Sequence, residues 1–271
     1  MTSLIVWVGV DQRSPASVYI ASDSRISWGN CTQWNCGSKL FTSPIHPIIA
    51  SYTGDSVFSV SCIHKIIERI QNKLLDFKIG SLGDKIKLLI ATELINYPKT
   101  HFNNSDIVIV VRQDGRLKLE CNFILYHYKC YKNGSISFTI DETKKFKSSE
   151  YMLCLGTGKN SVEEYLNKWR KSDASGTSRA IFSAFSDALS KGSDTYSSAP
   201  PQLCGLYRIG NGKKIGIIMQ GKRFFDGTEI TEKYNELNNI EWRNELFERC
   251  DGKTASMRTD AQPQPRPKQT I

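Results

Sequence analysis

The chain has 271 residues, and its 36 lysines and arginines outnumber its 27 aspartates and glutamates to give a formal net charge of +9. This length allows one large domain or two small ones. No uninterrupted apolar run is long enough to cross a bilayer, which argues against a membrane helix. Asp11 and Arg13 interrupt the first apolar run and no basic segment precedes it, so we expect no signal peptide and a cytoplasmic location.

Charge and cysteine usage give little indication of a partner or a cofactor. The basic residues are scattered, and no long stripe alternates them with aromatic residues, so a nucleic-acid-binding module is a minor alternative. Eight cysteines are present, and without a secretory signal we expect them to be reduced. Cys31 and Cys36 lie five residues apart with no second Cys or His pair at metal-site spacing. We therefore expect no metal and no other cofactor.

The N-terminal third alternates short apolar runs with polar turns. Residues 2–10 and 16–22 predict a β-hairpin, and residues 26–28, 39–42 and 47–52 predict three further short strands. Asp55 is a candidate N-cap for a helix. Beyond it, apolar residues recur at steps of three and four, as on one face of a helix. They are Ile63, Ile66, Ile67, Ile70, Leu74 and Phe77.

The middle of the chain predicts a second helix and then strands. Residues 82–97 place Ile86, Leu89, Ile90, Leu94 and Ile95 on one helical face, and Pro98 ends the helix. Asp114-Gly115 between two apolar runs predicts a hairpin turn that joins strands over 106–112 and 117–125. A strand over 135–140 and a basic loop over 141–149 follow.

The last part of the chain repeats the pattern of strand, helix pair and strands. We predict a buried strand over 151–155, helices over 160–171 and 176–190, and strands around 202–209 and 214–220. Residues 2–220 would thus form one domain of class α+β with layered sheets. We expect residues 221–250 to be an extension with a short helix over 240–247. The polar segment 251–271, which contains Pro263, Pro265 and Pro267, predicts a disordered tail.

Three residues near the N-terminus point to a nucleophile with its own base. Thr2 opens the first strand, Asp23 follows the second, and Lys39 opens a later one. A threonine hydroxyl is a weak nucleophile and needs an adjacent base. If Met1 were removed, the Thr2 α-amine, with an ordinary pKa of about 7.7–8.0, would suit that role. A Lys39 ammonium would favour the alkoxide, and Asp23 would keep Lys39 charged.

Thr2, the triplet Asp23-Ser24-Arg25, and Lys39 sixteen residues after Asp23 resemble the start of proteasome-type N-terminal nucleophile (Ntn) hydrolases. Within that family, Ser22 to Arg25 is closer to the bacterial ancestral-type branch, Anbu, than to HslV. The resemblance implies a four-layer αββα sandwich over residues 2–220. It also implies that the backbone at Ser27 holds an extended peptide substrate as an added strand, beside Arg25 of the triplet.

The family also supports the N-terminal amine with hydroxyl groups and a second aspartate. Gly156-Thr157-Gly158 offers Thr157 where serine is usual, and Asp194 with Ser197 follows at the family's step of 37 residues from Thr157. Asp187 with Ser190 is the competing pair. We prefer Asp194, because it precedes a strand whereas Asp187 lies inside an amphipathic helix.

The family takes its oxyanion donor from a glycine at the strand-to-helix turn, which makes Gly54 the candidate and the Thr53 N–H the alternative. The resemblance implies a threonine-type peptidase that assembles into a homo-oligomeric ring. An ATPase or regulator partner is compatible with the resemblance, though nothing in the chain shows one. The alternative is a catalytically silent ring or scaffold subunit, because Ser198-Ala199-Pro200-Pro201 replaces the usual glycines.

Overall fold

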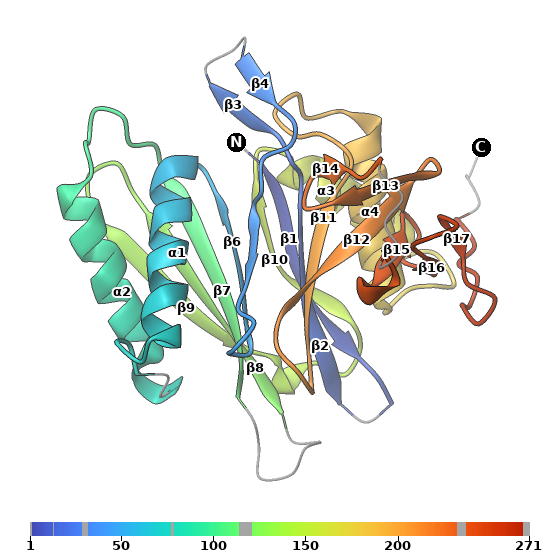
Figure 1. Ribbon diagram of the computed structural model, residues 1–271, viewed down its shortest axis with the longest axis horizontal. Helices are drawn as coiled ribbons and strands as arrows, with labels where there is room; N and C mark the ends of the chain where they lie inside the picture. Colours follow the sequence, from blue (N-terminus) through green and yellow to red (C-terminus); the bar gives the residue numbers. More distant parts are fainter. Residues whose placement is uncertain are drawn as a thin grey trace.

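Two β-sheets pack face to face, and a pair of helices covers each outer face (Figure 1). The computed structural model describes residues 2–12, 14–28, 32–76, 79–113, 121–231 and 237–267. Helices α1 and α2 lie on one side of the pair of sheets, and α3 and α4 lie on the other. This arrangement confirms the predicted α+β class and the four-layer αββα sandwich.

The first sheet contains the N-terminal hairpin at its centre. Its strands run in the spatial order β10-β1-β2-β11-β12, and neighbouring strands in this part of the sheet are antiparallel. Alternate residues of β1 face opposite cores, because Trp7 packs toward α3 and α4 while Val6 packs toward the other sheet. The bounds are β1 Ser3–Val10, β2 Pro15–Ser22, β10 Glu150–Gly156, β11 Gln202–Tyr207 and β12 Lys213–Met219.

The second sheet is an antiparallel meander in the order β5-β6-β7-β8-β9. The buried side chains of α1 and α2 form a core with one face of this sheet, and its other face meets the first sheet. The bounds are β5 Leu40–Thr42, β6 Ile48–Thr53, α1 Ser56–Gln71, α2 Ile79–Asn96, β7 Ser105–Gln113, β8 Asn122–Cys130 and β9 Ile136–Glu142.

Helix α1 begins as predicted, because the Asp55 side chain accepts a hydrogen bond from the backbone N–H of Phe58. It ends at Gln71, so Leu74 lies beyond it and is exposed. Phe77 falls outside the described residues. On α2, four predicted core residues are buried, whereas Ile95 is exposed because it lies on the outer side of the helix.

The other helix pair consists of α3, Lys159–Trp169, and α4, Ser178–Lys191. The α4 N-cap is Thr177, whose hydroxyl accepts from the Ala180 N–H. A small hairpin formed by β3, Ile26–Trp28, and β4, Thr32–Trp34, stands out above the sheets near the N-terminus (Figure 1).

The predicted turn at 114–115 and the predicted start of the next strand at Leu117 lie outside the described residues, and β8 is described from Asn122, opposite Gln113. Two other predictions for the middle of the chain need correction. Strand β10 is half-buried instead of buried, because its sheet partner in the part of the chain described is β1 alone. The predicted loop over 141–149 starts inside β9 and continues as a 3-10 turn, Thr143–Lys145.

The predicted helix over 240–247 is wrong. Trp242–Asn244 forms strand β15 instead, which pairs parallel to β12 and extends the first sheet. The Trp242 ring lies directly over Gly216 of β12, where a larger side chain would collide with it. The remaining elements of the extension are β13 Lys222–Phe225, β14 Thr228–Glu229, the 3-10 turn Leu237–Asn239, β16 Arg249–Asp251 and β17 Ser256–Met257.

The prediction of a disordered tail is also wrong as far as residue 267. The Gln264 backbone N–H donates to the Glu248 carboxylate, and Arg266 pairs with Asp187 on α4. Arg179 donates to the Gln262 carbonyl at 2.8 Å. The polar segment is held by these side chains of the domain, which its own composition could not indicate.

Candidate active site

The hairpin β1–β2 places Thr2 beside Asp23. Thr2 directly precedes β1, Asp23 directly follows β2, and the antiparallel register sets Leu4 opposite Ser22. The Ser3 N–H donates to Asp23 Oδ1 at 3.0 Å, and the Asp23 N–H donates to the Ser3 carbonyl at 3.1 Å. These two hydrogen bonds fix the open end of the hairpin, where both candidate residues lie.

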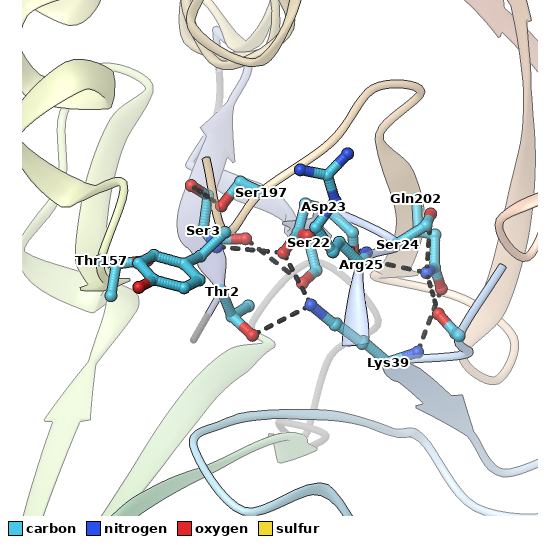
Figure 2. Close-up of polar contacts among 12 residues, drawn as sticks. Thr2, Ser3, Ser22, Asp23, Ser24, Arg25, Lys39, Thr157, Ser197 and Gln202 are labelled. Atoms are coloured by element: carbon cyan, nitrogen blue, oxygen red, sulfur yellow. Dashed lines mark hydrogen bonds and ion pairs between the residues drawn. The ribbon is translucent and has the colours of Figure 1, made fainter. Parts of the chain in front are cut away.

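Lys39 connects the two (Figure 2). Its ammonium Nζ donates to Thr2 Oγ1 at 3.0 Å and to Asp23 Oδ1 at 2.8 Å. Thr2, Asp23 and Lys39 are each no more than 1% exposed. Three residues that are distant in sequence thus form one buried chain of hydroxyl, ammonium and carboxylate.

Burial opposes both charges of this ion pair. Desolvation lowers the pKa of Lys39 below its ordinary value, although the Asp23 charge opposes the shift. Desolvation likewise raises the pKa of Asp23, against the Lys39 charge and two backbone N–H donors, Ser3 and Arg25. Because the Lys39 ammonium is shielded from water, its positive charge produces a strong electrostatic field at the neighbouring Thr2 hydroxyl. It favours the ionised, nucleophilic form of the Thr2 hydroxyl.

A second hydrogen-bonded chain approaches the same strand end from the other side. Asp194 Oδ2 accepts from Thr157 Oγ1 at 2.7 Å and from Ser197 Oγ at 2.8 Å. Ser197 Oγ also lies 2.8 Å from Ser3 Oγ. Because the single Ser197 proton is directed to Asp194, Ser3 is the donor in this contact. The structure therefore brings Thr157, Asp194 and Ser197 next to Thr2 through Ser3.

Asp187, the competing aspartate, is not part of this cluster. Its carboxylate accepts from the Trp169 indole Nε1 at 2.9 Å and pairs with Arg266. Both contacts lie on the outer helix layer. Asp194 is thus the aspartate that approaches the N-terminal strand.

Two glycines give the strand end its tight packing. Gly156 has a φ of +91°, and a Cβ there would come within 1.7 Å of the Thr2 carbonyl oxygen. A Cβ at Gly158 would come within 1.9 Å of Ser3 Oγ and 3.1 Å of Asp194 Oδ2. Glycine at both positions allows the segment that carries Thr157 to pass against residues 2 and 3.

Gly54 lies at the turn from β6 to α1, as predicted, with a φ of +89°. A Cβ there would come within 2.1 Å of the Asn104 carbonyl oxygen. The Asp55 N–H donates to Ser105 Oγ at 2.8 Å, and Thr53 Oγ1 donates to Asp106 Oδ2 at 2.9 Å. The start of β7 therefore holds this turn in place. These contacts explain the glycine, and its role as oxyanion donor stays a prediction.

Arg25 and Ser27 lie next to this cluster. The Arg25 N–H donates to Asp23 Oδ2 at 2.8 Å, while its guanidinium donates to Asn35 Oδ1 and to the Thr195 carbonyl. Arg25 thus connects the β3–β4 hairpin to the loop that carries Asp194. Ser27 lies in the middle of β3 opposite Gln33, and within the described chain the other edge of β3 has no strand partner.

Two residues of this cluster were not anticipated from the sequence. Ser3 links Asp23 to Ser197, and the only signal for it is its position next to Thr2. Gln202 is buried at the start of β11, and its amide contacts the segments of both Asp23 and Lys39 (Figure 2). A glutamine at the start of a predicted strand gives no such signal. Among the described residues, no group of three or more His, Cys, Asp or Glu could hold a metal ion.

Comparison with known proteins places the fold. No family model matches the sequence, and no curated protein matches it. The ancestral β-subunit Anbu from Yersinia bercovieri matches in structure with a TM-score of 0.52 and 13% sequence identity, over 78% of this chain and 86% of that chain. A eukaryotic HslV from Trypanosoma brucei matches with a TM-score of 0.46 and 13% identity, over 75% of this chain and 99% of that one.

The chain therefore has the fold of the proteasome-type Ntn hydrolases. The similarity to Anbu lies in the backbone arrangement, since few residues are identical. No helix in the described part of the chain is long and apolar enough to span a membrane.

Proposed function

We propose that the protein is a threonine-type peptidase that uses Thr2, after removal of Met1, as its nucleophile. The observation that carries this proposal is the buried contact of Lys39 Nζ with both Thr2 Oγ1 and Asp23 Oδ1. A buried ammonium next to a threonine hydroxyl has an evident use in nucleophilic catalysis. As a purely structural pair it would have to offset a large desolvation cost.

In the proposed reaction, the Thr2 α-amine accepts the proton of Thr2 Oγ1 while the oxygen attacks the carbonyl carbon of a peptide bond. Lys39 stabilises the developing alkoxide, and the N–H of Gly54 or of Thr53 stabilises the oxyanion. The C–N bond then breaks, and the ammonium of Thr2 returns the proton to the leaving amine. Water hydrolyses the resulting acyl ester and restores the hydroxyl.

The other predicted residues have supporting roles in this proposal. Asp23 holds Lys39 in its charged form, and Asp194 and Ser197 orient the N-terminal segment through Ser3. Thr157 fixes the Asp194 carboxylate. The edge of β3 at Ser27 that has no strand partner among the described residues, with Arg25 at its base, receives the backbone of an extended peptide.

The resemblance to proteasome-type hydrolases extends the proposal to assembly and location. We propose a homo-oligomeric ring in the cytoplasm, whose inner surface would restrict access to the nucleophile. Sedimentation velocity of the purified protein tests this part. A monomer at all concentrations would contradict it and would leave the chemistry at Thr2 to be tested separately.

The test of the chemistry is intact mass spectrometry with and without a threonine-directed epoxyketone. We expect a mass that lacks Met1 and gains a single adduct. Thr2→Ser keeps a hydroxyl and an amine and should still react, whereas Thr2→Ala should give no adduct and no peptide hydrolysis. A protein that retains Met1 and forms no adduct would refute the proposal and favour a silent scaffold subunit.

A further inference from the structure

The amide of Gln202 touches both backbone segments that carry the Asp23–Lys39 pair. Its Oε1 accepts from the Lys39 N–H at 3.1 Å, and its Nε2 donates to the Gly37 carbonyl at 2.7 Å. The same Nε2 contacts Ser24 Oγ at 3.0 Å and, more weakly, the Asp23 carbonyl at 3.4 Å. Figure 2 shows Gln202 on the side of Lys39 remote from Thr2.

These contacts use both ends of the amide and determine its orientation. Gln202 is only 2% exposed, so its hydrogen bonds are formed away from bulk water. A buried amide restricts the positions of its hydrogen-bond partners more than an exposed amide does. If one of its hydrogen bonds is lost, a polar group is left buried without a partner, and water cannot replace that partner. Gln202 therefore bridges the Asp23 and Lys39 segments from β11, beside the hydrogen bond that the Gly37 N–H donates to the Ser24 carbonyl at 2.9 Å.

One turn of the C-terminal extension packs against the Gln202 amide. Gly227, in the turn between β13 and β14, has a φ of +83°, and a Cβ there would come within 3.1 Å of Gln202 Nε2 and 2.8 Å of Ser24 Oγ. The neighbouring Asp226 accepts from Ser38 Oγ at 3.0 Å and pairs with Lys214 at 2.6 Å. Ser38 directly precedes Lys39, so the turn contacts the lysine segment as well.

We propose that Gln202 is a positioning residue for the Asp23–Lys39 pair and that the Asp226–Gly227 turn of the C-terminal extension holds Gln202 in place. The extension thus contributes to the site although none of its described residues is among the candidate catalytic groups. This inference rests on the proposed function, because it assigns Gln202 a role in the reaction at Thr2. It makes a separate prediction about the geometry of Lys39.

Two variants of the full-length protein test it, each with a readout that a merely structural role would leave unchanged. Gln202→Met keeps the length of the side chain but removes its hydrogen bonds. Gly227→Ala presses a methyl group onto Ser24 and Gln202. Gly221→Ala is the matched control, because Gly221 also has a positive φ of +74° in a nearby turn but no atom within 4 Å of a Cβ.

We expect Gln202→Met and Gly227→Ala to lower kcat, per active site titrated with epoxyketone, by roughly 10- to 100-fold with little change in KM. Gly221→Ala should keep the wild-type kcat. The alkaline limb of the pH profile should move to lower pH in both test variants. Lys39 feels the charges of Asp23, Asp194 and Arg25, and a longer distance to Asp23 weakens the main group that keeps it protonated.

Equal kcat values for Gly227→Ala and Gly221→Ala would overturn the role of the turn. A wild-type kcat and alkaline limb in Gln202→Met would overturn the role of Gln202. If wild-type protein hydrolyses no peptide, the proposed function fails, and NMR titration of the Lys39 ammonium decides the positioning role instead. An unchanged Lys39 titration in Gln202→Met would then refute it, whereas a shift to lower pH would support it.

Discussion

Ser3 Oγ and Ser197 Oγ lie 2.8 Å apart, although 194 residues separate them in the sequence. Through this contact the loop that carries Asp194 reaches the first strand, immediately beside Thr2. The Ser3 backbone N–H simultaneously donates to Asp23. Ser3 thus joins the two halves of the candidate site, one from the N-terminal hairpin and one from the segment after α4.

The pH dependence of hydrolysis follows from the burial of the ion pair. Lys39 has a lowered pKa and Asp23 a raised one, both because of desolvation. Activity that needs the Lys39 ammonium should be lost on the alkaline side below the ordinary pKa of lysine. The acid limb should follow protonation of the Thr2 α-amine, the proposed base, whose ordinary pKa of about 7.7–8.0 lies well above that of aspartate. Values of kcat/KM for a fluorogenic peptide across the pH range check this. An alkaline limb at the ordinary lysine pKa would contradict it.

Breaking the ion pair should cost more stability than replacing both of its members. We expect Lys39→Met to destabilise the fold by about 3–5 kcal/mol, because it leaves the Asp23 carboxylate buried without its counter-charge. Asp23→Asn together with Lys39→Met should recover part of that loss, since it removes the buried charge. The recovery is incomplete because Ser3 and Arg25 donate to different carboxylate oxygens and an amide oxygen can replace only one of them. Urea unfolding at neutral pH measures both, and a double variant as unstable as the single one would contradict the expectation.

The stability of Lys39→Met should also depend on pH in a defined direction. Without Lys39, the pKa of Asp23 should rise further, so the folded state binds a proton that the unfolded state releases. Stability then falls as pH rises between the unfolded and folded pKa values of Asp23. The difference in the free energy of unfolding between wild type and Lys39→Met should therefore become smaller as the pH is lowered. A difference that stays constant with pH would show that Asp23 remains ionised throughout.

Gly156→Ala should be far more damaging than a substitution at another glycine of similar backbone conformation. Gly134 has a φ of +87°, close to the +91° of Gly156, but a Cβ there meets nothing within 4 Å. Gly134→Ala should cost about 1 kcal/mol from backbone strain alone. Gly156→Ala should cost about 1–3 kcal/mol more from the collision with the Thr2 carbonyl, and should abolish epoxyketone labelling. Thermal unfolding and labelling of both variants decide this.

Substitution of Asp194 should lower catalytic activity, whereas substitution of Asp187 should lower only the stability of the fold. Asp194→Ala removes the acceptor of Thr157 and Ser197, and we expect kcat to fall roughly 10- to 100-fold. Asp187→Ala should keep the wild-type kcat but lose about 1–3 kcal/mol, because the buried Trp169 N–H loses its acceptor. The reverse pattern, with kcat lost in Asp187→Ala, would restore the competing aspartate to the site.

Local patterns were sufficient for much of the fold. The β1–β2 hairpin, the Asp55 cap and the buried faces of α1 and α2 follow from periodicity and capping, which depend on residues only a few positions apart. The prediction failed over 240–247, where the sequence is compatible with a helix but Trp242 packs on Gly216 and forms a strand. A contact between residues so far apart in sequence is invisible to a local pattern.

The sequence by itself determined the layered α+β arrangement and the residues Thr2, Asp23 and Lys39 as candidates, because their spacing resembles a known family. Only the tertiary structure decided that Asp194 rather than Asp187 reaches the N-terminal strand, and that residues 251–267 pack against the domain. It alone brought Ser3, Gln202 and Gly227 to the site. The physical reason is that hydrogen bonds and close packing depend on distances in space, which separation along the chain does not fix.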